Sequence, residues 1–156
     1  MKTVIPLLAL LVSTASLADD LRMQHAYPAE YRSECGSCHD PYPPGMLNKG
    51  DWANVMSRLD RHYGTDASLD DKTMADIARW LERNAGRRAG AQGEPPRFTT
   101  TTWFKREHRE VPAKAWQDPR VKTPANCSGC HLNAAKGNYN EDQISIPGQN
   151  RRLEDD

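Results

Sequence analysis

All four cysteines of the chain lie in two short segments that share one pattern. The first motif spans residues 35–39 (C-G-S-C-H) and the second spans residues 127–131 (C-S-G-C-H). This pattern, with two residues between the cysteines and a histidine directly after them, is the attachment signature of c-type haem. The spacing lets both thiols reach the vinyl groups of one porphyrin. The histidine that follows lies under the iron. The pattern predicts two covalent haem c groups, attached through Cys35, Cys38, Cys127 and Cys130, with His39 and His131 as proximal iron ligands.

Other chemistries that use paired cysteines explain the pattern less well. Two disulfides would leave the histidine after each pair without a role. A single zinc site would have to span the 88 residues between Cys38 and Cys127, far more than a compact zinc module contains. A thioredoxin-like redox pair needs a strand and helix around it and would not occur twice. Haem attachment is therefore the favoured interpretation.

The second axial ligands must come from the other histidines, from methionines, or be absent. Three histidines lie outside the motifs: His25, His62 and His108. The 25 residues after His131 contain neither His nor Met, so any sixth ligand for the second haem comes from upstream. The two halves of the chain are therefore expected to interlock.

His62 lies in a segment with strong helical periodicity. Apolar residues recur at helical spacing from Trp52 to Tyr63, with Asp51 as a candidate N-cap and Gly64 as a stop signal. His62 follows Leu59 by three residues and shares the apolar face of this expected helix. In a chain that needs iron ligands, a ligand role is favoured over that of a core histidine.

The remaining candidates have weaker local signals. Phe104 precedes His108 by one helical turn, in a short helix with Thr101 or Thr102 as its expected cap and Pro112 as its limit. This local pattern leaves a ligand role and a solvated histidine equally open. His25 has no periodic setting. Three methionines are possible ligands, although the last two fit apolar helical stripes: Met46, Met56 and Met74.

Composition points to a fold that depends on its cofactors. Hydrophobic residues make up 37% of the 156 residues, below the roughly 45–50% usual for globular domains when Gly is counted. The chain also has 11 Pro and 10 Gly, which indicates long irregular stretches. Two porphyrin faces can supply the missing apolar core. We therefore expect a mainly α fold with much irregular coil, wrapped around two covalent haems.

The balance of 21 basic and 21 acidic residues argues against a nucleic-acid partner.

The first 18 residues have the form of a signal peptide. Lys2 is followed by an apolar run that is too short to span a bilayer, and Ala18 lies at a signal-peptidase position. We expect cleavage near Ala18, export to the periplasm and a mature dihaem domain over residues 19–156. No later segment is apolar enough for membrane insertion.

Within the mature chain, the positions of helix-breaking residues suggest a division into two halves. The expected first-haem half covers about 19–86, a Gly-, Arg- and Pro-rich linker covers about 87–97, and the second-haem half covers about 98–156. A second helix is expected after Ser68, with an apolar stripe from Met74 to Ala85 and a stop at Gly86. The sequence also suggests a short helix from Thr123 through the second motif and one short strand at residues 144–146.

These stretches together resemble the periplasmic dihaem cytochromes c. The resemblance covers most of the mature chain and rests on eight segments: 34–39, 42–47, 52–59, 62–64, 66–69, 103–109, 126–131 and 144–147. Tyr63 departs from the family pattern, in which Phe is common.

The resemblance implies two low-spin haems, each with two His ligands, and it points to His62 and His108 as the sixth ligands. Chain order pairs His62 with the first haem and His108 with the second, while a crossed pairing is also possible. The family resemblance implies an electron carrier, often partnered with a membrane cytochrome b and a small high-spin c-type cytochrome.

Ligation by two histidines would leave no open position on either iron, which favours electron transfer over catalysis. It would also hold the reduction potential below that of a Met/His cytochrome c. Two alternatives remain. If one of these histidines does not bind, an open iron would suit a haem enzyme or a gas-binding sensor. The chain would equally suit a small electron-feeding subunit of a larger reductase.

Overall fold

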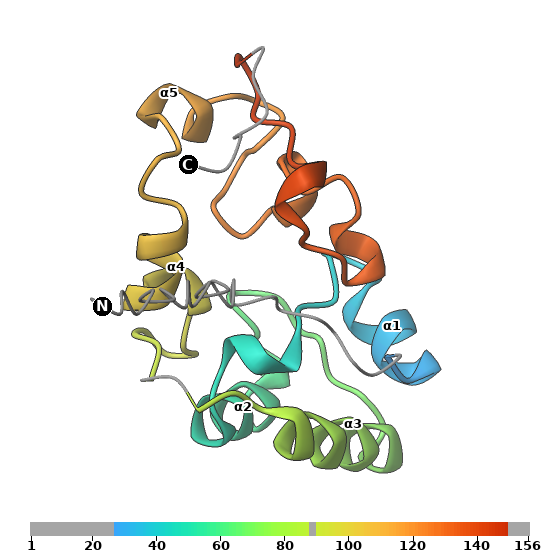
Figure 1. Cartoon of the computed structure of the whole chain (residues 1–156). Coiled ribbons are helices and arrows are strands. Elements are labelled where there is room, and N and C mark those ends of the chain that lie inside the picture. Colours follow the sequence, from blue (N-terminus) through green and yellow to red (C-terminus); the bar gives the residue numbers. More distant parts are fainter. Residues whose placement is uncertain (1–26, 88–89, 150–156) are drawn as a thin grey trace, which may run out of the picture.

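The computed structural model describes residues 27–87 and 90–149, and every regular element in these ranges is a helix or a single 3-10 turn (Figure 1). The helices are α1 (Ala29–Cys35), α2 (Lys49–Met56), α3 (Asp71–Asn84), α4 (Thr102–Glu107) and α5 (Ala113–Trp116). The 3-10 turns are Pro44–Met46, Leu59–Arg61, Phe98–Thr100, Cys127–Gly129, Ala134–Lys136 and Glu141–Gln143.

This architecture confirms the expected fold class of helices joined by irregular coil. The described residues contain isolated β-bridges but no strand. The strand predicted at residues 144–146 is therefore wrong: Ile144 makes only a single bridge, to His131. The predicted signal peptide and His25 lie outside the described residues.

Most of the apolar core lies in the N-terminal part of the fold, where α2 packs against α3 and α1 packs on α3 (Figure 1). The predicted stripe of α3 is confirmed, because Ile77 and Leu81 are almost completely buried. The side chains of the core cluster are Tyr27, Tyr31, Met46, Leu47, Trp52, Val55, Met56, Ile77, Leu81, Phe98 and Phe104.

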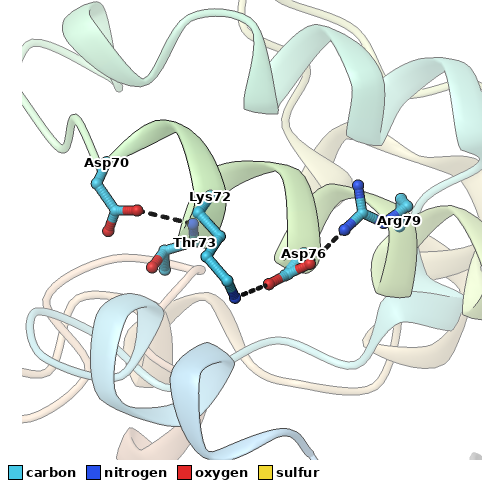
Figure 2. Close-up of polar contacts among 5 residues, drawn as sticks. All are labelled: Asp70, Lys72, Thr73, Asp76 and Arg79. Atoms are coloured by element: carbon cyan, nitrogen blue, oxygen red, sulfur yellow. Dashed lines mark hydrogen bonds and ion pairs between the residues drawn. The ribbon is translucent and has the colours of Figure 1, made fainter.

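The start of α3 is set by Asp70 rather than by the predicted Ser68. The Asp70 carboxylate accepts a hydrogen bond from the Thr73 amide at 3.0 Å, as an N-cap does (Figure 2). Ser68 is engaged elsewhere, because its amide donates to the Asp66 carboxylate. Further along the exposed face, the Asp76 carboxylate pairs with Lys72 and Arg79 (Figure 2).

The helix predicted from residue 52 to residue 63 is only partly correct. α2 begins after Asn48, whose side chain caps the Asp51 amide, and it ends at Met56. Tyr63 and Gly64 have φ angles of +52° and +95°, which an α-helix excludes. His62 therefore lies in a turn, half-buried, rather than on a helix face.

The segment predicted as a linker packs along α2 in its described part. The Asp51 carboxylate accepts a hydrogen bond from the Ala91 amide at 3.0 Å. Tyr63 donates its hydroxyl proton to the Pro96 carbonyl at 2.6 Å. The Arg97 guanidinium stacks on the Tyr63 ring, 4.4 Å from its centroid. This segment thus closes over the turn that carries His62.

The second half has little apolar core of its own. Four apolar residues after α4 are buried, and none of them joins the main cluster: Ala115, Val121, Ala134 and Ile146. The helix predicted over residues 124–131 is reduced to the 3-10 turn Cys127–Gly129. The reason is that Asn126 has a non-helical ψ of 80° and donates its side-chain amide to the Arg120 and Val121 carbonyls.

At Gly86, just after α3, the backbone comes close to the segment before α2. Its amide donates to the Leu47 carbonyl at 2.8 Å, and a Cβ at Gly86 would lie 2.2 Å from the Gly45 carbonyl oxygen. We expect Gly86→Ala to destabilise the fold by about 1–3 kcal/mol, because the backbone must shift to make room. Chemical denaturation measures this loss. The matched control is Gly45→Ala, since a Cβ there meets no atom within 4 Å, and equal stability losses in the two variants would contradict the argument.

Candidate functional site

The first motif begins where α1 ends. Cys35 is the last residue of that helix, and the next turn is closed by the Gly36 amide bonded to the Arg32 carbonyl. Ser37 donates its hydroxyl to the Glu34 carbonyl at 2.8 Å. This turn places Cys38 at the surface and His39 half-buried against the interior.

The second motif forms a tight 3-10 turn in the C-terminal part of the fold. The His131 amide donates to the Cys127 carbonyl at 2.8 Å, which closes the turn. Outside the motif, the Ser145 amide donates to the Cys130 carbonyl at 2.8 Å. The segment after the turn thus holds it in place.

Each motif histidine faces one of the two histidines predicted as sixth ligands. The ring centroids of His39 and His62 are 6.2 Å apart, and those of His131 and His108 are 6.1 Å apart. Two imidazoles bound to one metal from opposite sides have centroids roughly 6 Å apart, because each metal–nitrogen bond is about 2 Å and each ring adds its half-width. Both pairs therefore fit an iron between them.

The two pairs differ in the angle between their rings. The His39 and His62 planes are nearly parallel, at 22°. The His108 and His131 planes are nearly perpendicular, at 73°. The arrangement brings together the histidines that chain order paired, and it places no crossed pair in ring contact among the described residues.

Backbone carbonyls orient one histidine of each pair. His39 Nδ1 lies 2.7 Å from the Asp40 carbonyl, and His108 Nδ1 lies 2.9 Å from the Phe104 carbonyl. A carbonyl oxygen only accepts, so each Nδ1 carries the proton and each Nε2 keeps its lone pair for a metal. The Nδ1 atoms of His62 and His131 are buried without a hydrogen-bond partner in the described structure.

Burial favours the neutral form of the facing histidines. It lowers the pKa of His131 to about 4, with a further lowering by the nearby His108. It also lowers the pKa of His62 and of His108. Neutral imidazole is the form that binds a metal ion, so these rings suit iron ligation at neutral pH.

Burial disfavours a reactive thiolate at the first cysteine of each motif. No disulfide joins any of the four cysteines, and burial raises the pKa of Cys35 and of Cys127 to about 12. A cysteine that reacts as a redox nucleophile has a lowered pKa instead. No group of three or more His, Cys, Asp or Glu side chains suited to a metal ion occurs in residues 27–87 and 90–149. The structure thus supports neither a disulfide pairing nor a reactive redox pair among these cysteines.

Aromatic rings cover the histidines, and the sequence patterns identified only part of this shell. The Tyr42 ring stacks on His39 at 4.7 Å and 14°, and the Phe104 ring stacks on His108 at 4.0 Å and 23°. The Tyr139 ring lies tilted against His131 at 5.3 Å. Tyr42 and Tyr139 were missed because neither belongs to a periodic pattern.

The two motifs are direct neighbours. Tyr42 donates its hydroxyl proton to the Ala125 carbonyl at 2.8 Å, and Ser128 donates its hydroxyl and its amide to the Asp40 carboxylate. A pocket of about 370 Å³ is lined by residues of both motifs, Cys38 and Ser128 among them. Two groups attached here would lie close together.

The methionines considered as ligands have packing roles. Met46 and Met56 are buried in the core cluster, and Met74 packs against it.

No helix in the described ranges combines the length and apolarity needed to cross a bilayer.

Comparison with known proteins identifies relatives of this chain. The family model of dihaem cytochrome c matches residues 31–139, which is more than half of the chain. No curated protein matches. Three solved structures are similar to this one. A diheme cytochrome type c from Shewanella baltica OS155 shares 36% identity over 81% of this chain and 99% of its own, with a TM-score of 0.70.

The second similar structure is DHC from Rhodobacter sphaeroides, with 34% identity over 72% of this chain and 96% of its own, and a TM-score of 0.63. The likeness thus covers nearly the full length of both relatives. With two attachment motifs and a facing histidine for each, the chain belongs to the dihaem cytochrome c family: it is a haem electron carrier with two covalently bound haem c groups.

Proposed function

We propose that this protein is a periplasmic electron carrier in which His39 with His62 and His131 with His108 each bind one iron. The observation that carries the proposal is the facing of two imidazole rings across a gap of 6.1–6.2 Å between centroids at both motifs. Each haem, when bound, supplies an iron that alternates between the ferric and ferrous states. With both axial positions filled, no substrate reaches the metal.

The protein's own residues serve this role by holding the ligands still. Stacking of Tyr42 on His39 and of Phe104 on His108 limits the tilt of each ring, and carbonyl hydrogen bonds fix their rotation. The Tyr63 hydroxyl ties the His62 turn to Pro96. Such a rigid shell keeps the rearrangement between the two oxidation states small.

We further propose that electrons enter from a membrane cytochrome b or a quinol-linked donor and leave to a soluble partner such as a small high-spin c-type cytochrome. This assignment rests on the family resemblance. A transient partner docks over a small area guided by charge. The export signal predicted in residues 1–18 supports the periplasm as the location.

Optical spectra of the purified protein with and without carbon monoxide test the proposal. We expect low-spin spectra for both haems, oxidised and reduced, and no change on adding carbon monoxide, because no axial position is open. A high-spin component or a carbon monoxide adduct in the native protein would contradict ligation by two histidines at that haem and would favour an enzyme or gas sensor.

A further inference from the structure

One side chain connects the two motifs through two hydrogen bonds. Asp40 directly follows His39, and its carboxylate accepts from the Ser128 hydroxyl at 2.7 Å and from the Ser128 amide at 2.9 Å. Ser128 lies between the two cysteines of the second motif, 88 residues further along the chain. The residue that directly follows the first motif is thus hydrogen-bonded to a residue within the second motif.

The contact completes a turn that lacks a cap of its own. The 3-10 turn Cys127–Gly129 begins after Asn126, whose side chain makes no capping hydrogen bond. The Ser128 amide lies at the start of this turn, where backbone N–H groups have no acceptor within the turn. Asp40 supplies that acceptor from the other motif, so the position of the second turn depends on the first.

The carboxylate also brings a negative charge to the second site. Asp40 is half-buried, so water screens its charge less than that of an exposed residue. Its oxygens lie 2.7 Å from the Ser128 hydroxyl and 2.9 Å from the Ser128 amide, between the two cysteines that attach the second haem. A negative charge close to a haem favours the ferric form, which carries one more positive charge than the ferrous form.

We propose that Asp40 is a positioning residue that docks the second attachment turn onto the first and selectively lowers the reduction potential of the second haem. This inference rests on the proposed function, since it requires two low-spin haems that change oxidation state. On this proposal, the spacing of the two haems and the difference between their reduction potentials both depend on the contact between Asp40 and Ser128.

The test is a potentiometric titration of the holoprotein and its Asp40→Asn variant. The two haems are followed separately by electron paramagnetic resonance, because the signal of a low-spin ferric haem depends on the angle between its imidazole planes, here 22° and 73°. We expect Asp40→Asn to raise the potential of the haem with near-perpendicular ligands more than that of the other haem.

Two further variants make the test specific. Asp71→Asn removes the same charge from the exposed first turn of α3 and should leave the difference between the two potentials unchanged. Ser128→Ala keeps the charge and removes one hydrogen bond, and it should shift the second potential in the same direction but by less. It also serves if Asp40→Asn does not fold.

The outcomes separate the two proposals. If the native protein is not low-spin at both haems, the proposed function fails. If the native spectra are low-spin but Asp40→Asn changes the potentials no more than Asp71→Asn does, or if both haems shift equally, the role of Asp40 is overturned. If only the Ser128→Ala variant can be purified, an unchanged reduction potential of the second haem overturns the proposed role of Asp40.

Discussion

Replacing His62 by alanine should convert half of the haem from low-spin to a form that binds carbon monoxide. The His62 ring faces His39 at 6.2 Å between centroids, and no other histidine of residues 27–87 and 90–149 makes a ring contact with His39. Loss of the imidazole therefore leaves one axial position open. Optical titration with carbon monoxide measures the converted fraction, and His108→Ala should convert the other half through the pair with His131.

The two variants also distinguish direct from crossed pairing. His62→Ala should abolish the resonance signal of the near-parallel pair, and His108→Ala that of the near-perpendicular pair. His25→Ala is the matched control, because it removes a histidine to which we assign no iron, and it should leave both signals intact. A fully low-spin spectrum in His62→Ala or in His108→Ala would show that the ligand assignment is wrong.

Removing both cysteines of the second motif should cost the protein one haem and the order of its C-terminal part. The buried apolar side chains beyond α4 are few and lie outside the main cluster, so the porphyrin face is needed to complete this half. We expect the double variant Cys127→Ala, Cys130→Ala to have a protein mass lower by that of one haem. Amide exchange of residues 113–149 should become fast, while α2 and α3 stay protected.

The contrast with His108→Ala separates loss of the cofactor from loss of a ligand. That variant keeps both thioether bonds, so it should retain two haems and more protection in residues 113–149 than the double cysteine variant. If the double cysteine variant stays fully protected there, the second half has a sufficient core without its haem, and the dependence argued from burial is wrong.

Local patterns in the sequence predicted the elements whose determinants are close together. The apolar stripe that includes Ile77 and Leu81 identified α3, and Thr101 was one of two predicted caps for α4, where it accepts from the Phe104 amide at 3.1 Å. The errors arose where longer-range contacts compete with periodicity. The run from Trp52 to Tyr63 looks helical, yet the chain turns after Met56, and Tyr63 takes a positive φ with its hydroxyl on Pro96.

The sequence by itself determined the chemistry of this protein. Attachment of haem c depends on a thiol spacing and a histidine within five residues, and that information is entirely local. The same patterns selected His62 as a candidate ligand and, with the family resemblance, His108. They also indicated that the haems stand in for a scarce apolar core.

Only the tertiary structure decided which histidines face each other, at what ring angle, and how the two motifs meet. These features depend on contacts between segments far apart in the chain, such as Asp40 with Ser128 and Tyr42 with Ala125. A single carboxylate or hydroxyl in coil produces no periodic signal. Its partner is set by how the helices and turns between them pack, and that packing becomes defined only when the whole chain has folded.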